Sequence, residues 1–318
     1  KDDAIRLHRV EVARLPIIYT RIAQASDRAY KLGPDALEAD ANDRITALID
    51  RFERVARAEG LTAVSEGGVG SNLDRWLAHV RSRPQREPVA RLQGGGLEVV
   101  VIPGMGGRIL SLKRLADGRE FMDVNSTAAG IDPTVGGYEE FSESNYRSPG
   151  WNERYEVADR SDRAITLRAN LANGLAVERR YALDSVQPVL RVSTTLTNAS
   201  PEPREACIRV HPCFRMDDAA QAVVRLGPPG AKEVGLASGQ SQETELWLRG
   251  NDRPAGEWAL IDQSAGVALV SRFDPAQVEI CYLNWSGPDR RANLELWSPS
   301  ARLEPGESIT LAHAYEIA

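Results

Sequence analysis

The chain has 318 residues, of which 42% are apolar and 26% charged, and its formal net charge is −6. Charges of both signs are mixed along it, which argues against a nucleic-acid-binding protein, because such a protein presents a basic face. No apolar run reaches the roughly 18 residues that a membrane-spanning helix needs. We therefore expect neither a nucleic-acid partner nor a membrane partner.

The first 85 residues carry a helical pattern. Apolar residues recur at three- and four-residue steps from Ile45 to Val55, and Gly60 is a typical stop signal. Pro16 is expected in a first turn or at a kink. We predict an α-helical region over residues 1–85. The chain opens inside this pattern and not with methionine, so we expect the region to be the tail of a preceding domain.

A linker and a β region follow. Residues 82–88 hold two prolines and three charges, which disfavour both helix and central strand. Strands with turn signals between them are expected at residues 97–102, 108–115, 153–158, 164–169, 175–183, 189–198, 206–214, 243–248, 258–261, 267–271, 278–283, 292–297 and 308–317. So many strands without interleaved helices predict a large antiparallel sandwich over residues 90–318.

The three cysteines indicate no disulfide framework, because an odd number leaves at least one unpaired. Cys207 and Cys213 are six residues apart, which is too loose for a zinc-binding pair of the C-x-x-C kind. The glycine clusters at 94–96 and 104–107 are not followed by a helix, as a phosphate-binding loop would be. We expect no metal site and no cofactor.

Three motifs in the β region occur in the order of a known family. The run Gly106-Gly107-Arg108-Ile109 follows a predicted strand. A second predicted strand has a Thr-x-x-Asn sequence at its end, a turn follows it, and the strand after that turn ends in His211-Pro212-Cys213-Phe214. Near the end, Leu294-Glu295-Leu296-Trp297 precedes a Leu-x-Pro-Gly-Glu turn at 303–307. Over about residues 90–318 these motifs resemble the galactose mutarotase-like (aldose 1-epimerase) superfamily.

The resemblance implies an antiparallel β-supersandwich with a sugar site on the concave face of one sheet. Glu295 matches the base that takes the proton from the anomeric hydroxyl, and His211 matches the acid that protonates the ring oxygen. An imidazole with its ordinary pKa of about 6.5 suits that role. Two positions depart from the family: Cys213 replaces an aromatic residue, and residues 136–141 lack a second histidine that the epimerases usually carry.

Residues 136–151 are predicted to form a binding loop, because aromatic rings stack on sugar C–H faces and carboxylates accept hydroxyl hydrogen bonds. A loop pinned to its own sheet by Tyr138 and Trp151 is the alternative. Trp285 and Trp297 could add stacking surfaces, but core packing is favoured for either of them taken alone. The substrate-binding residues that we expect are Arg108, Tyr138, Glu139, Glu140, Tyr146, Trp151 and Trp285.

The predicted function is that of a carbohydrate-binding protein of the aldose 1-epimerase type, with anomer interconversion by acid–base chemistry as its possible reaction. The alternative is a non-catalytic carbohydrate-binding or accessory module at the C-terminus of a glycoside hydrolase. Residues 9–17 resemble the helical tail of bacterial glycoside-hydrolase-like proteins, which implies a preceding catalytic domain. A third hypothesis is that Glu139, Glu140, Glu143 or Glu153 supplies one of the two carboxylates that a glycosidase needs to cleave a glycosidic bond.

The expected ligand is a mono- or oligosaccharide. The compartment stays open: a fragment of a polysaccharide-degrading protein would favour the periplasm or the outside of the cell, and any other origin would favour the cytoplasm.

Overall fold

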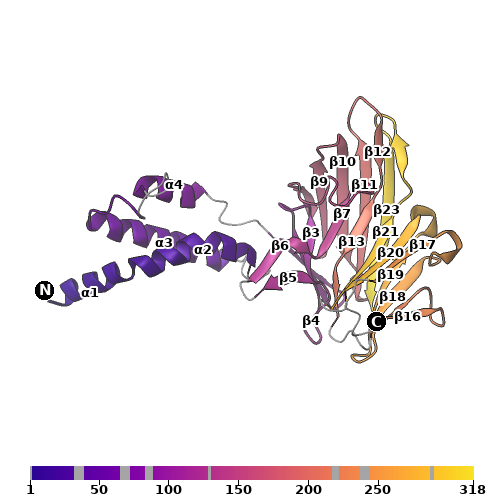
Figure 1. Cartoon of the computed structure of the whole chain (residues 1–318), viewed down its shortest axis with the longest axis horizontal. Coiled ribbons are helices and arrows are strands. Elements are labelled where there is room, and N and C mark those ends of the chain that lie inside the picture. Colours follow the sequence, from indigo (N-terminus) through magenta and orange to yellow (C-terminus); the bar gives the residue numbers. More distant parts are fainter. Residues whose placement is uncertain are drawn as a thin grey trace. The chain divides into compact units, whose positions relative to one another are not determined.

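A computed structural model describes residues 2–31, 39–64, 72–82, 89–127, 130–216, 222–236, 244–286 and 290–318. The chain divides into two compact units, one of residues 1–87 with 126–132 and one of residues 88–125 with 133–318. Figure 1 shows the helices of the first and the sheets of the second. Most of the predicted linker, residues 83–88, lies outside the described residues.

The helical unit has, in its described part, α1 (Asp2–Ala13), α2 (Leu15–Lys31), α3 (Ala39–Ala58) and α4 (Leu73–Ser82). Pro16 lies in the first turn of α2, where its missing N–H removes no helical hydrogen bond. The apolar faces of α2, α3 and α4 share one core cluster. In it Trp76 packs against Tyr19 and Phe52, with ring centroids 5.0 Å from each. None of the described helices is long and apolar enough to span a membrane.

The β unit is built mainly from two antiparallel sheets, as predicted. Within the described residues, sheet A has ten strands: β1 (Ala90–Gly94), β2 (Leu97–Ile102), β3 (Arg108–Arg114), β4 (Arg119–Glu120), β7 (Tyr138–Phe141), β13 (Arg209–Pro212), β14 (Phe214–Arg215), β17 (Thr244–Arg249), β20 (Ile280–Ser286) and β21 (Arg291–Trp297). Sheet B has nine: β8 (Glu156–Arg160), β9 (Ala164–Asn170), β10 (Leu175–Leu183), β11 (Val189–Asn198), β15 (Ala222–Arg225), β16 (Glu233–Gly235), β18 (Glu257–Asp262), β19 (Val267–Phe273) and β23 (Ser308–Ile317).

Short elements complete the fold. They are the strand pair β5 (Val124–Thr127) with β6 (Gly130–Gly136), the pair β12 (Arg204–Ala206) with β22 (Ala301–Leu303), and the 3₁₀ turns η3 (Gly250–Asp252) and η4 (Pro275–Gln277). The strands at 97–102, 175–183, 189–198 and 308–317 have the predicted bounds.

The order of sheet A brings distant parts of the chain together. Its main path runs β1-β2-β3-β7-β13-β21-β20-β17, so β13 lies between β7 and β21. Sheet B runs β16-β15-β18-β19-β23-β11-β10-β9-β8. One apolar cluster takes side chains from both sheets, which places the core between them.

The structure corrects the prediction of a continuous loop at 136–151. Residues Tyr138–Phe141 form β7, a central strand of sheet A, and only the residues after it form a loop. The predicted strand 206–214 is also interrupted, because β13 ends at Pro212 and β14 begins at Phe214. Side chains in β7 therefore alternate between the two faces of sheet A.

A buried ion pair lies inside the sandwich. Glu140 of β7 accepts a hydrogen bond from Arg179 Nε at 2.9 Å, and both side chains are almost fully buried. The remaining Arg179 donors reach the Gly106 carbonyl at 2.6 Å and the Tyr155 hydroxyl at 3.3 Å. Tyr138 also donates to Glu140. This network satisfies two charges that would otherwise be costly in the core.

We predict that Glu140→Ala lowers the free energy of unfolding by roughly 3–5 kcal/mol, because it leaves the Arg179 charge buried without its partner. Guanidinium denaturation followed by near-ultraviolet circular dichroism measures the change. Glu178→Ala is the control, since it removes an exposed ion pair with Arg168, and we expect less than about 1 kcal/mol from it. Equal effects of the two substitutions would contradict the prediction.

Candidate functional site

The strand register gives sheet A a polar face opposite its core face. Side chains paired across neighbouring antiparallel strands point to the same side. His211 pairs with Glu139, Arg209 with both Phe141 and Trp297, and Tyr282 with Glu295. We call this side of sheet A the polar face. The register places on it, from β7, β13, β21, β20 and β17, the residues Glu139, Phe141, Arg209, His211, Asn293, Glu295, Trp297, Ile280, Tyr282, Asn284, Glu245, Trp247 and Arg249.

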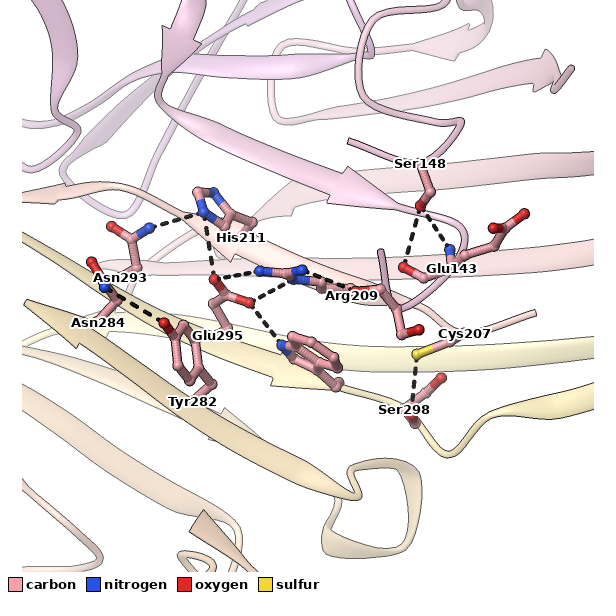
Figure 2. A network of polar contacts seen from close by, with 12 residues as sticks. Glu143, Ser148, Cys207, Arg209, His211, Tyr282, Asn284, Asn293, Glu295 and Ser298 are labelled. Carbon is pink, nitrogen blue, oxygen red and sulfur yellow. Dashed lines mark hydrogen bonds and ion pairs between the residues drawn. The ribbon is translucent and has the colours of Figure 1, made fainter. Parts of the chain in front are cut away.

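Glu295 is held by a guanidinium and an indole (Figure 2). Arg209 donates from Nε to Oε2 at 2.8 Å and from Nη2 to Oε1 at 3.2 Å, while Trp297 Nε1 donates to Oε2 at 2.7 Å. The Glu295 side chain is 1% exposed. Burial raises the pKa of this carboxyl and the Arg209 contact works against that rise. Arg209 is also held by its Nη1, which donates to the Ser144 carbonyl at 3.0 Å.

His211 lies beside this pair. Its Nε2 is 3.4 Å from Glu295 Oε1 and 3.0 Å from Asn293 Nδ2, and its Nδ1 is 4.0 Å from Cys213 Sγ. Burial, with the charge of Arg209 nearby, lowers the pKa of the imidazole from 6.5 to about 3. The folded protein therefore holds His211 neutral near pH 7, and the ring does not carry the extra proton that the acid role requires.

Arg108 and Glu139 form a second buried pair on the same face. Arg108 Nη1 donates to Glu139 Oε1 at 2.7 Å and to the Gly136 carbonyl at 2.8 Å. Burial raises the pKa of Glu139, and the charges of Arg108 and Arg147 oppose the rise. The pair depends on a close backbone approach at Gly137, which has φ 74° and where a Cβ would overlap the carbonyl of Ile109.

The loop after β7 borders His211 and Arg209 with aromatic rings. The ring of Tyr146 lies 5.4 Å from that of His211 and is 56% exposed as a residue. The Arg147 guanidinium lies 4.4 Å from the ring of Trp151, and Arg147 has the left-handed φ of 59°. Left-handed backbone is strained for arginine, and such strain is commonest at functional sites.

Three of the expected site residues do not reach the polar face. Tyr138 and Glu140 alternate with Glu139 on β7, so they point into the sandwich, where they join the Arg179 network. Trp285 is 1% exposed and belongs to the core cluster. The structure does bring His211, Glu295, Arg108, Glu139 and Tyr146 into one region, with Trp151 contacting Arg108 through its carbonyl at 3.4 Å.

Several polar-face residues were missed by the sequence-based prediction. Arg209 lies two residues from His211, so the period of two along a strand could have found it. Trp297 was not missed, because it was predicted as a stacking surface or a core residue, and the strand register places it on the polar face. Trp247 and Tyr282 belong to no motif, and their place on the polar face follows only from the pairing of β17 with β20.

Two other glutamates of the cleavage hypothesis make local structural contacts. Glu143 accepts a hydrogen bond from Asn173 Nδ2 at 2.8 Å, and Glu153 accepts one from the Gly150 N–H at 2.7 Å. Among the described residues, no group of three or more histidine, cysteine, aspartate and glutamate side chains is placed to hold a metal ion.

Of the buried polar atoms without a partner in the described residues, some lie on the polar face, whereas others, such as Trp258 Nε1 and Tyr315 Oη, lie in the core. Within the part of the chain that the structure describes, Glu139 Oε2, Asn293 Oδ1 and Arg108 Nε are buried without a hydrogen-bond partner. Buried polar groups are nearly always paired, so such atoms need an explanation. Two are acceptors and one is a donor.

Comparisons with known proteins identify the fold. No protein-family model and no curated protein matches the chain. A galactose mutarotase-like protein from Clostridium acetobutylicum is similar over 73% of this chain and 96% of its own, with a TM-score of 0.58 and 16% identity. A galactose mutarotase related enzyme from Lactobacillus acidophilus is similar over 73% of this chain and 97% of its own, with a TM-score of 0.55 and 14% identity.

A TPR-domain containing protein from Parabacteroides distasonis is similar over 72% of this chain but only 47% of its own, with a TM-score of 0.55 and 15% identity. At these identities the comparisons show the galactose mutarotase-like fold, which confirms the fold predicted from the sequence.

We predict that His211 stays neutral from pH 8 to pH 5, because burial lowers its pKa to about 3. Ring ¹⁵N chemical shifts, assigned by comparison with His211→Gln, report the protonation state. Titration of His211 within that pH range would contradict the prediction.

The same lowered pKa predicts a pH dependence of stability. The unfolded ring binds a proton near its ordinary pKa of 6.5 and the folded ring does not, so the contribution of His211 is present above about pH 6.5 and is lost as the pH falls toward 3. The free energy of unfolding of His211→Gln should therefore fall less over this interval than that of the unsubstituted protein.

Proposed function

We propose that the polar face of sheet A binds a carbohydrate. The observation that carries the proposal is the set of buried unpartnered atoms, Glu139 Oε2, Asn293 Oδ1 and Arg108 Nε. A sugar hydroxyl donates one hydrogen bond and accepts others. Vicinal hydroxyls can supply both the donors and the acceptor that these three buried atoms lack.

The side chains around these atoms support the same ligand class. Tyr146 is 56% exposed, and the guanidinium of Arg209 lies 5.7 Å from its ring. Aromatic rings next to fixed polar groups can contact the C–H face of a pyranose while its hydroxyls are hydrogen-bonded. The fold shared with galactose mutarotase-like proteins agrees with a sugar ligand, although fold alone does not decide function.

Anomer interconversion is a second candidate function, favoured by one observation. Glu295 has a raised pKa, which suits a general base, and an imidazole lies 3.4 Å from it. The neutral state of His211 and the two hydrogen bonds from Arg209 to Glu295 oppose this candidate. A base that is already paired with a guanidinium must lose that contact before it can take a proton.

The accessory-module alternative concerns the whole chain. We propose that residues 1–85 are the tail of a preceding domain and that residues 90–318 serve it as a carbohydrate-binding module. The match to the Parabacteroides TPR-domain containing protein spans 47% of that chain, so in that protein a region similar in fold is part of a longer chain.

For the binding proposal, we predict that Glu139→Gln weakens sugar binding about 10- to 100-fold, the loss expected for a hydrogen bond to a charged group. Isothermal titration with a panel of neutral hexoses, pentoses and their oligosaccharides measures it. Glu178→Gln makes the same chemical change at an exposed position of sheet B and should leave affinity unchanged. The proposal fails if no sugar of the panel binds the unsubstituted protein, or if both variants bind equally well.

Polarimetry on freshly dissolved α-glucose and α-galactose tests the second candidate. Catalysis by Glu295 and His211 would accelerate the approach to anomeric equilibrium, and both Glu295→Gln and His211→Ala would abolish the acceleration. No acceleration by a protein that still binds the sugar would remove this candidate and leave the binding proposal intact.

A further inference from the structure

Three aromatic rings on the polar face form a strip beside Glu295. The ring of Trp247 lies 4.3 Å from that of Tyr282 and 5.5 Å from that of Trp297. These residues come from β17, β20 and β21, which are neighbours at one end of sheet A. We call Trp247, Tyr282 and Trp297 the aromatic strip.

The strip is on the polar face, and part of it is open to solvent. Trp247 is 47% exposed, whereas Tyr282 and Trp297 are each 7% exposed and share a small buried cluster with Cys207 and Ile280. The guanidinium of Arg249 lies 5.3 Å from the ring of Trp247, and that of Arg209 lies 4.2 Å from the ring of Trp297. Packing of the sandwich core does not account for an indole in this position.

Hydrogen bonds and register make the strip continuous with the proposed sugar site. Trp297 donates to Glu295 Oε2 at 2.7 Å, and Tyr282 pairs with Glu295 across β20 and β21 (Figure 2). From His211 on β13 to Trp247 on β17 the path crosses three strand spacings, or roughly 14 Å. One pyranose ring is too short to contact both ends.

We propose that the aromatic strip is a second subsite, which holds the following residues of an oligosaccharide whose first residue lies against Glu139, His211 and Glu295. This inference rests on the proposed function and specifies its substrate class: a glycan chain of two or more residues. A ligand of that kind explains why an indole is left half exposed at the end of a polar surface.

The chemistry of the strip favours a glycan over a protein partner. Its rings alternate with guanidinium groups and stand next to the amide of Asn284, whose Nδ2 lies 3.5 Å from the Tyr282 hydroxyl. A protein interface core is depleted in charge and broadly apolar. Ring faces interleaved with hydrogen-bonding groups match the alternating C–H faces and hydroxyls of linked pyranoses.

A glycan array that carries chains from one to six residues provides the probe. The trisaccharide of the best-retained series and its own monosaccharide are then titrated calorimetrically into the unsubstituted protein, into Trp247→Ala and into Trp247→Phe. We expect the trisaccharide to bind the unsubstituted protein at least about tenfold more tightly than the monosaccharide, as one favourable ring contact allows. Trp247→Ala should abolish this length dependence and leave monosaccharide affinity unchanged, and Trp247→Phe should keep part of it.

The outcomes separate the two proposals. The second subsite is contradicted if the unsubstituted protein binds the monosaccharide and the trisaccharide with equal affinity. It is also contradicted if Trp247→Ala lowers the affinity for both sugars by the same factor. In either case the proposal of sugar binding stands. Retention of no glycan by the unsubstituted protein overturns the proposed function and this inference with it. Glu139→Gln, which should weaken both ligands by a similar factor, shows that the first residue occupies the proposed site.

Discussion

The ion pair between Arg209 and Glu295 fixes the geometry of the polar face. A carboxylate that is 1% exposed loses almost all of its hydration, and burial of this kind is tolerated only when good hydrogen bonds replace the water. Arg209 supplies two such bonds and Trp297 a third. Because β13 and β21 are paired through Arg209 and Trp297, the backbone places both donors beside the carboxylate. A ligand that approaches Glu295 must be accommodated by these donors or compete with them.

The same pairing determines which residues of the chain can act together. Much of the fold could be predicted from alternation, turn signals and three ordered motifs, because these are local properties of the sequence. His211, Glu295 and Arg108 could be named for the same reason, since each lies in a motif. Tyr138, Glu139 and Glu140 were placed with them only because residues 136–151 were taken as a loop. Once β7 is a strand, neighbouring side chains must point to opposite faces.

The remaining features depend on contacts between distant segments. Nothing local in the sequence indicates that β7, β13 and β21 lie side by side, or that β17 ends the sheet next to β20. From the sequence alone, Arg209 cannot be distinguished from any other polar strand residue, because its contact with Glu295 depends on the pairing of β13 with β21. Trp247 would be taken for a core residue, because the face of sheet A on which it lies depends on the pairing of β17 with β20. The lowered pKa of His211 is likewise a property of its burial and of the surrounding arginines, not of the motif that contains it.

Cys213 is a buried thiol next to His211. Its sulfur lies 4.0 Å from His211 Nδ1, and burial raises the pKa of the thiol to about 12. Alkylating reagents attack the thiolate, so this cysteine is inert while the face stays closed. In a protein whose other two buried free cysteines, Cys207 and Cys281, are substituted, the rate at which Cys213 is alkylated therefore reports how often the region beside His211 opens in the absence of ligand.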